Sequence, residues 1–514
     1  MRRMPQAFQV VDLFAGPGGL AEGFSGFEDG TGHRPFDVTM SVEKERSAHR
    51  TLQLRAFLRQ FDEFPDEYYA ALNAGADMPD WSKSHAGEWE TALGEALCLE
   101  LGTEQAGRVL DQRIDELLRL DVPTVVIGGP PCQAYSLVGR SRNMGKTDYV
   151  PAEDQRHFLY REYIRILKRL RPVAFVMENV KGMLSSSIDG QRIFDQVLGD
   201  LRGAAGEGSY VLLAIGHGRS GAMVLRTPRD AADFIVRAEG FGVPQARHRV
   251  IVVGIRSDLA AGLRLSGESA GVAPKRASVR TVLEGMPALR SGLSRADDPA
   301  AWRETVLAQV SRVVDALSED PAFSHGLRER AREHLAAFEG RNSALERTSR
   351  ERPAAMSDDH RTLADWIEDP RLEVLLNHST RGHMDEDLAR YFFSAVFTEV
   401  VGRAPKASEF PVTLAPDHAN WSTGKFADRF RTQAWDRVST TVTSHISKDG
   451  HYFIHPDPAQ CRSLTVREAA RLQTFPDNYL FLGNRTEQYV QVGNAVPPFL
   501  ARQIAEVLWG ALDS

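Results

Sequence analysis

The sequence predicts an α/β fold in which a mostly parallel, doubly wound sheet carries helices on both faces. In the first half of the chain, short β-branched runs alternate with segments of helical periodicity, as in strands joined by crossover helices. The first candidate strand runs directly into a glycine-rich turn that opens a helix. With 514 residues, 42% hydrophobic and 25% charged, the chain has the length and composition of a globular protein of two domains.

The candidate strands are short segments rich in Val, Ile and aromatic residues. They are Gln9 to Phe14, Val38 to Val42, Thr124 to Ile127, Ala174 to Glu178, Tyr210 to Ile215 and Val250 to Ile255. Between two of them, residues 159–170 carry one apolar stripe at helical spacing, and Pro172 ends this helix. A Thr465/Glu468 capping box predicts a later helix start, and a final helix is expected at about Pro498 to Leu512.

The pattern along the chain predicts three parts. Residues 1–255 form the α/β domain, with a polar insert at about 62–106. Residues 256–485 form a second part, and as far as about residue 435 it shows short helical pieces and loops without strand alternation. Residues 486–514 form the C-terminal segment with its helix.

Bulk properties exclude several classes of protein. No window reaches the roughly 18 apolar residues of a membrane span, and the N-terminus shows no signal peptide, so we expect a cytoplasmic protein without a membrane partner. The three cysteines form no CxxC pair, and His378 and His445 lack ligand spacing, so no metal site is predicted. The formal charge of -7 argues only weakly against nucleic acid, because one cleft can still be basic.

The glycine-rich turn Phe14-Ala15-Gly16-Pro17-Gly18-Gly19-Leu20 lets the backbone approach a nucleotide-like ligand. It lacks the strict GxGxxG spacing, and a tight turn without a ligand is an equally good interpretation on this pattern alone. Glu43 ends the second strand, where a carboxylate can accept hydrogen bonds from ribose hydroxyls or simply be solvated.

The sharpest feature is Cys132, in Gly129-Pro130-Pro131-Cys132-Gln133 directly after a buried strand. Two prolines stiffen the turn and fix the direction of the thiol, as a nucleophile requires. A lone cysteine is often only a small buried residue. The rigid loop at the carboxyl edge of the sheet favours the nucleophile.

Two further features point to the same edge. Glu178 ends the fourth strand and can act as an acid or be an ion-paired structural carboxylate. Arg247 and Arg249 alternate before the last strand, where two guanidinium groups suit a phosphate or carboxylate, or form a solvated basic face.

In order and spacing these blocks resemble the cytosine-C5 DNA methyltransferases, typified by bacterial restriction-modification enzymes. The similar blocks are residues 12–19, Pro130-Pro131-Cys132-Gln133, Glu178-Asn179-Val180, the QxRxR pattern of Gln245, Arg247 and Arg249, residues 467–476, and residues 491–497. The resemblance covers most of residues 9–255 and about 436–512. It leaves out most of residues 256–435, where this family keeps its target-recognition domain.

The resemblance implies a Rossmann-like fold that binds S-adenosylmethionine, with an inserted, smaller target-recognition domain. Expected cofactor-binding residues are Phe14, Ala15, Gly16, Gly18, Gly19, Leu20, Glu43, Asp111, Pro130, Asn494 and Val496. Asp111 is placed only by its distance to Cys132, because the early insert blurs the alignment.

The resemblance also implies a chemistry on flipped-out cytosine in double-stranded DNA. Cys132 attacks C6, Glu178 contacts N3 and the amine, and Gln133, Arg247 and Arg249 complete the catalytic set. Ser136, Arg140, Arg142 and Gln245 are expected to bind DNA, within a basic lid after Gln133. A cognate restriction or phage-defence complex is the expected partner.

Two alternatives stay open. One branch of the family methylates cytosine in tRNA, although the long 256–435 region favours DNA. A catalytically silent nucleic-acid-binding regulator is the other, although Cys132, Glu178 and Arg247 are all intact. In the recognition region, Arg429, Arg431 and Arg437 around Trp435 are equally compatible with nucleic-acid contact and with a solvated face.

Overall fold

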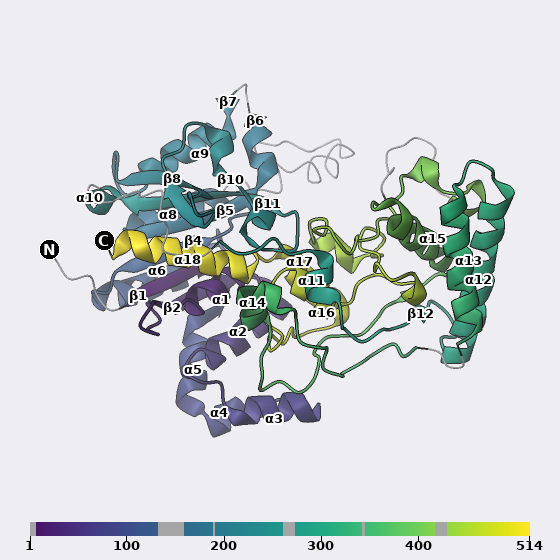
Figure 1. The fold of residues 1–514 in the computed structure, drawn as a ribbon. Coiled ribbons are helices and arrows are strands. Elements are labelled where there is room, and N and C mark those ends of the chain that lie inside the picture. The colour runs from purple at the N-terminus through teal and green to yellow at the C-terminus, as the bar shows by residue number, and fades with distance from the viewer. Residues whose placement is uncertain are drawn as a thin grey trace.

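The protein consists of a larger α/β lobe and a smaller helical lobe joined by long connections (Figure 1). A computed structural model describes residues 7–131, 159–188, 191–260, 273–341, 345–416 and 429–513. Among these residues, no helix has both the length and the apolar character needed to cross a membrane.

A mixed sheet of nine strands forms the centre of the larger lobe within the described residues. Its strands are β1 (Phe8–Leu13), β2 (Phe36–Glu43), β3 (Ala96–Cys98), β4 (Thr124–Gly128), β5 (Ala174–Val180), β8 (Tyr210–His217), β9 (Met223–Arg226), β10 (Ile235–Arg237) and β11 (His248–Arg256). The order is β3-β2-β1-β4-β5-β11-β8-β9, and β10 pairs with β11. All six predicted strands are present, whereas β3, β9 and β10 were not predicted.

The strand order reverses between β1 and β4. From β1 the chain builds outward through β2 and β3, and then returns to add β4 and β5 on the other side, all in parallel. β11 runs antiparallel between β5 and β8. Ligands bind outside the carboxyl ends of the strands at such a reversal. The segments that follow Leu13 and Gly128 therefore begin at this position.

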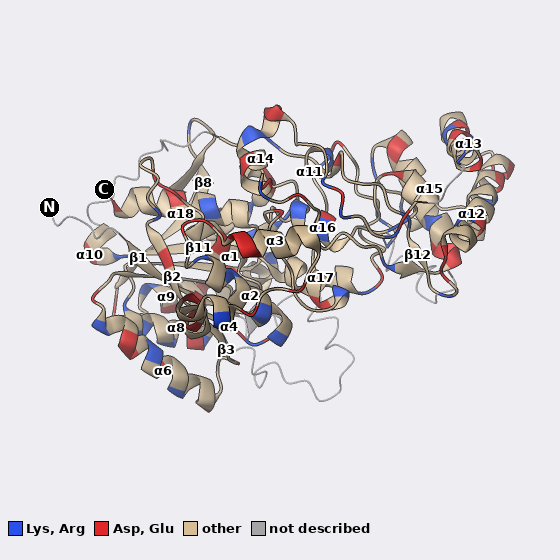
Figure 2. Cartoon of the chain, turned by 90° about the horizontal axis from the view of Figure 1, so that it is seen from below, with Lys and Arg blue, Asp and Glu red and all other residues tan. Residues whose placement is uncertain are grey.

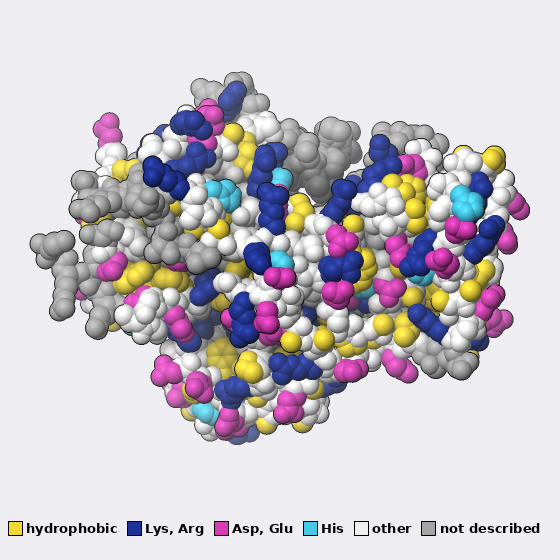
Figure 3. All heavy atoms as spheres, in the orientation of Figure 1, with side chains coloured by type: hydrophobic (Ala, Val, Ile, Leu, Met, Phe, Trp, Pro, Cys, Tyr) yellow, Lys and Arg dark blue, Asp and Glu magenta, His cyan; other side chains and the backbone are white. Residues whose placement is uncertain are grey.

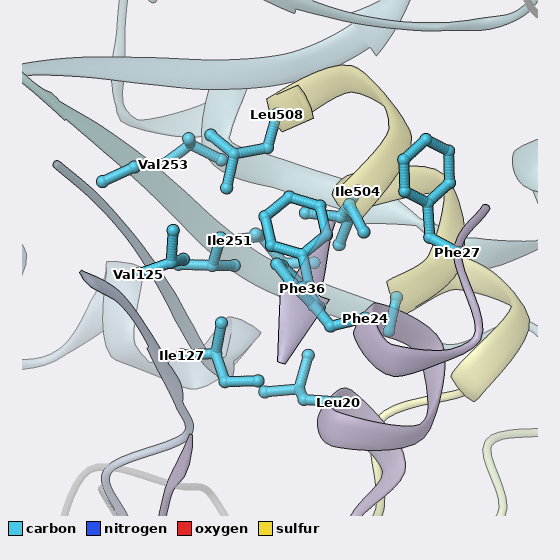
Figure 4. Close-up of a cluster of buried hydrophobic side chains, with 14 of the residues drawn as sticks. Leu20, Phe24, Phe27, Phe36, Val125, Ile127, Ile251, Val253, Ile504 and Leu508 are labelled. Atoms are coloured by element: carbon cyan, nitrogen blue, oxygen red, sulfur yellow. The ribbon is translucent and has the colours of Figure 1, made fainter. Parts of the chain in front are cut away.

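Helices cover both faces of the sheet because successive side chains of each strand point to opposite faces. Phe8 and Val10 face the core under α1 (Gly19–Ser25) and α18 (Pro498–Leu512). Val11 and Leu13 face the core under α6 (Glu104–Arg119), α8 (Leu159–Leu170) and α9 (Ile193–Arg202). Figure 4 shows the first of these cores, with Phe24 of α1 and Ile504 of α18 directed into it. The doubly wound α/β prediction is confirmed.

The predicted early insert is mainly helical and supplies the edge strand β3. After α2 (Arg46–Leu58) it forms α3 (Asp66–Ala74), α4 (Trp81–Ser84) and α5 (Ala86–Glu95). Asn73 donates a hydrogen bond to the carbonyl of Arg371 and accepts one from the amide of Glu373. Leu372 and Leu376 pack into the apolar core of the insert. The insert therefore anchors residues 371–376, which lie far from it in the sequence.

The second lobe is built on α12 (Pro299–Glu319), α13 (His325–Glu339) and α15 (Asp385–Val401). The side chains of Asp298 and Ser324 cap the first two of these helices. Apolar residues of all three share one core. These helices are longer than the short helical pieces predicted from the sequence.

Between the lobes lies a block of short helices: α11 (Val279–Leu283), α14 (Arg361–Ile367), α16 (Val466–Leu472) and α17 (Arg485–Asn494). The predicted capping box of Thr465 and Glu468 starts α16. Fully buried Arg467 donates to the carbonyls of Leu376, Pro476 and Tyr479. Because an unpaired buried cation is costly, these bonds fix the segments that they join.

Candidate active site

Three residues of the glycine turn after β1 have the left-handed backbone conformation, and two of them are glycines. Phe14, Gly16 and Gly18 have φ of 59°, 59° and 98°. The amide of Ala15 donates to the carbonyl of Val42 over 3.0 Å, and that of Gly16 to Oε2 of Glu43 over 2.8 Å. The turn is therefore fastened to the end of β2.

Glu43 is partly buried at the end of β2, between the turn and the next helix. Burial raises the pKa of its carboxyl, while the amides of Glu45 and Gly16 lower it. The same edge includes Leu99, directly after β3, whose amide donates to the carbonyl of Glu43 over 3.1 Å. Leu99 was not expected at this edge, because β3 has only three residues and none is β-branched.

The C-terminal segment approaches the same turn. A Cβ atom at Gly19 would overlap the carbonyl oxygen of Val496, so only glycine allows this contact. Val496 is buried, whereas Asn494 at the end of α17 is exposed. A Cβ at Gly23 would lie 2.5 Å from the carbonyl of Pro498, so α1 and α18 are also tightly packed. The predicted meeting of these distant segments is present.

The loop that leads to Cys132 is held by the residues around Glu178. A Cβ atom at Gly128 would overlap the carbonyl of Leu13, and one at Gly129 would lie 2.9 Å from Oε2 of Glu178. Asn179 is buried, and its Nδ2 donates to the carbonyl of Pro130 over 2.8 Å. The glycines thus allow the close approach, and Asn179 fixes the backbone two residues before Cys132.

Glu178 and Arg249 form an ion pair between neighbouring antiparallel strands. Arg249 Nε lies 2.8 Å from Glu178 Oε1, and the two side chains are 14% and 13% exposed. Arg249 Nη1 also donates to the carbonyl of His248. The guanidinium group therefore orients the carboxylate while leaving Oε2 toward Gly129.

Arg247 and Gln245 have different surroundings from those expected. Arg247 is buried and donates to the carbonyls of Val442 and Gly493, and burial with nearby Arg249 lowers its pKa well below the usual value. Gln245 is fully buried, donates to Leu472 and Gln473, and accepts from the amide of Val442. In this structure, both side chains join the segment that precedes β11 to residues 442–493, here called the C-terminal block. Gln245 is 0% exposed, so a contact with DNA would require its side chain to leave this buried position.

Asp111 lies away from the third strand of the sheet, on α6. Its carboxylate pairs with Arg165 at 2.6 Å and Arg169 at 2.5 Å, both on α8. The sequence places Asp111 only by its distance to Cys132, whereas the third strand along the chain is β3, which lies within the early insert and was not predicted. The structure gives Asp111 a helix-to-helix contact and shows no contact with the glycine turn.

Other expected residues lie outside the described ranges or in different surroundings. Cys132, Gln133, Ser136, Arg140 and Arg142 all fall in the segment 132–158, which the structure does not describe. His378 bonds Thr465 and the carbonyl of Pro287, and burial lowers its pKa to about 4. No cluster of three metal-ligating side chains occurs in the described part of the chain.

Residues 256–435 end at Trp435, which packs against a cation. The Arg280 guanidinium lies 5.3 Å from the ring centroid of Trp435 and pairs with Asp436. Arg429 pairs with Asp449 at 3.4 Å. Trp435 and Arg429 therefore both have partners within the chain.

Comparisons with known proteins identify the family. The sequence model of the C-5 cytosine-specific DNA methylases matches residues 86–215 and 232–509, more than half of the chain. The type II methyltransferase M.Bpa9945I of Bacillus paralicheniformis is 32% identical over 525 residues, covering 97% of this chain and 98% of that protein. The DNA (cytosine-5-)-methyltransferase M.ApeKI of Aeropyrum pernix is 28% identical, with 76% of this chain and 82% of the relative covered.

A solved structure supports the fold. A prophage-encoded Escherichia coli protein, solved as a candidate DNA modification methyltransferase, matches 99% of this chain and 100% of its own with a TM-score of 0.51 and 19% identity. The glycine turn precedes the range of the family model, whereas the alignment with the Bacillus relative covers 97% of the chain. The resemblance predicted from the sheet-edge motifs is confirmed: the chain belongs to the family of C-5 cytosine-specific DNA methylases.

Proposed function

We propose that this chain methylates C5 of a flipped-out cytosine within a specific sequence of double-stranded DNA, with Cys132 as the nucleophile. The observation that carries the proposal is the placement of Glu178. Its carboxylate is oriented by Arg249 and lies against Gly129, three residues before Cys132. This arrangement stands where the strand order reverses, beside the glycine turn.

The chemistry follows from these residues. The Cys132 thiolate adds to C6 of cytosine, the electron pair of the C5–C6 double bond shifts to C4–C5, and that of the C4–N3 double bond moves onto N3, which makes C5 nucleophilic. Glu178 contacts N3 and the exocyclic amine, and a proton shared with N3 neutralises the charge that develops there. After methylation, loss of the C5 proton to a base restores the double bond and expels Cys132 as a thiolate. Arg249 holds Glu178 in place for these steps.

The residues around the glycine turn fit S-adenosylmethionine. A Cβ at Gly16 would meet nothing within 4 Å, so open space lies beside the turn. Glu43 binds the amide of Gly16 and so offers a carboxylate beside the turn, and Phe14, two residues before Gly16, has a half-buried ring. When bound, this cofactor supplies the electrophilic methyl group. The proposed binding residues are Phe14, Ala15, Gly16, Gly18, Gly19, Leu20, Glu43, Pro130, Asn494 and Val496.

The region between the lobes is the proposed DNA-binding surface. On the face shown in Figure 3, Lys and Arg side chains gather near the centre, and Asp and Glu are frequent on the outer edge of the smaller lobe. Figure 2 shows charges of both signs over the outer helices. Since phosphate contacts supply much of DNA affinity, the central basic side chains suit the backbone. Residues 256–435 would then read the sequence.

The relatives suggest the biological setting. The Bacillus relative is named as a type II methyltransferase, and several others carry the same description. We therefore propose a place in a restriction-modification or phage-defence system, with a nuclease that cuts the same unmethylated sequence as partner.

Sequencing at single-base resolution tests the proposed function. Unmethylated genomic DNA is incubated with S-adenosylmethionine and either wild-type protein or Cys132→Ala, and 5-methylcytosine is mapped. The proposal requires methylation in one short motif with the wild type only. Methylation of tRNA but not DNA would favour the RNA enzyme, and no methylation of either would overturn the proposal.

A further inference from the structure

Tyr479 connects the C-terminal block to the glycine turn. It lies between α16 and α17, is fully buried, and its hydroxyl donates a hydrogen bond to the carbonyl of Pro17. The two residues are 462 positions apart in sequence. A Cβ at Gly18 would stand 3.3 Å from the same hydroxyl, so the turn and the tyrosine are in close contact.

The carbonyl of Pro17 needs such a donor. Proline has no N–H, so the carbonyl is its only polar backbone group. The flanking residues Gly16 and Gly18 both have positive φ, and inside the turn the amide of Gly18 donates to Ala15. A buried carbonyl without a partner costs about 1–3 kcal/mol. The Tyr479 hydroxyl therefore supplies the hydrogen-bond donor for the carbonyl of Pro17.

The aromatic ring of Tyr479 is itself held from several sides. The Arg55 guanidinium lies 4.5 Å from its ring centroid, and Arg55 forms an ion pair with Glu22 of α1. Phe475 packs at a centroid distance of 4.7 Å. Burial raises the pKa of Tyr479, so its hydroxyl stays protonated and acts as a donor. A phenylalanine would fill the same core but would not bind Pro17.

We propose that Tyr479 is a positioning residue for the cofactor, which acts through Pro17 to hold the glycine turn in its binding conformation. The inference rests on the proposed function, since it assigns the turn to S-adenosylmethionine. It predicts that the loss of one hydroxyl group lowers cofactor affinity without touching the reacting atoms.

Tyr68 provides a matched control. It is fully buried, and its hydroxyl donates over 2.7 Å to the carbonyl of Asn478, the residue before Tyr479. Within the described part of the chain, its ring packs against Phe64 and Tyr69 and not against the glycine turn. Tyr479→Phe and Tyr68→Phe each remove one hydroxyl that donates to a backbone carbonyl, that of Pro17 in the first variant and that of Asn478 in the second, and only Pro17 belongs to the glycine turn.

Calorimetric titration with S-adenosylmethionine is the test. We expect Tyr479→Phe to raise Kd and KM for the cofactor about fivefold, with kcat at saturating cofactor within about twofold of wild type. Tyr68→Phe should leave Kd unchanged while losing similar stability. Amide exchange in residues 14–20 of the free protein should be faster in Tyr479→Phe only.

The outcomes separate the inference from the proposed function. Wild-type affinity and exchange in Tyr479→Phe, or equal losses of affinity in the two variants, would overturn the positioning role. A wild-type protein that binds no S-adenosylmethionine would overturn the proposed function and this inference together.

Discussion

Arg249 Nε lies 2.8 Å from Glu178 Oε1, across two antiparallel strands at the edge of the sheet where the loop to Cys132 begins. A guanidinium group is charged and planar, so it orients a carboxylate that is largely removed from water. The pair is therefore the structural basis for the proposed contact of Glu178 with cytosine.

Changes at Arg249 should slow methyl transfer. Arg249→Met leaves the Glu178 carboxylate without its cation, and we expect the single-turnover rate to fall about a hundredfold. Arg249→Lys keeps the charge but loses the planar guanidinium group, so a fall of about tenfold is expected. Arg256→Met, at the other end of β11 where Arg256 pairs with exposed Asp258, is the control and should keep the rate. A wild-type single-turnover rate in Arg249→Met would contradict the role of Arg249 in orienting Glu178.

Asn179 should control the loop that carries Cys132. Asn179→Asp keeps an oxygen for the amide of Val180 but removes the Nδ2 donor to Pro130. Because the loop then loses its anchor, we expect kcat to fall about tenfold, with unchanged Kd for S-adenosylmethionine. Rapid-quench kinetics and calorimetry measure the two quantities. An unaltered kcat would show that the loop needs no such anchor.

Gln245 should act on stability rather than on DNA contact. Gln245→Ala leaves the Val442 amide and the Gln473 side chain without their buried partner, at a cost of about 1–3 kcal/mol in the free energy of unfolding. The dependence of DNA affinity on salt should stay as in the wild type, because no phosphate contact is lost. Urea unfolding and salt titrations test both statements. Unchanged stability with weaker DNA binding would restore the interpretation of Gln245 as a DNA contact.

Asp12 should make stability depend on pH. Burial raises the pKa of its carboxyl from 3.8 to about 8, while Arg59 lowers it and the carboxylates of Glu43 and Glu95 raise it further. The folded chain then keeps a proton that the unfolded chain loses near pH 3.8. This contribution to stability is complete below that pH and is lost as the pH rises to about 8, by at most about 1.4 kcal/mol per pH unit.

The isosteric variant Asp12→Asn isolates this effect. The free energy of unfolding of the wild type minus that of the variant should fall steadily between about pH 5 and about pH 8. A constant difference over this range would mean that Asp12 is ionised in the folded protein.

The sequence predicted those parts of the site that depend on local pattern. Strands such as 124–128 are β-branched runs between helical segments, and parallel strands bring Leu13 and Gly128 to one edge. It could not predict long-range partners. The Val442 and Gly493 carbonyls that bind Arg247 lie 195 and 246 residues away. Nor could it predict β3, because this strand has only three residues, none of them β-branched.

The covalent step at Cys132 is the central claim, and trapping tests it most directly. Duplex DNA is made with 5-fluorocytosine in place of cytosine, so that after methylation C5 carries fluorine and no proton that can leave. The account predicts a complex that survives denaturation, forms only with S-adenosylmethionine, maps to the peptide of Cys132 and is absent in Cys132→Ala. A wild-type protein that methylates ordinary DNA but gives no such complex, or attaches through another residue, would contradict it.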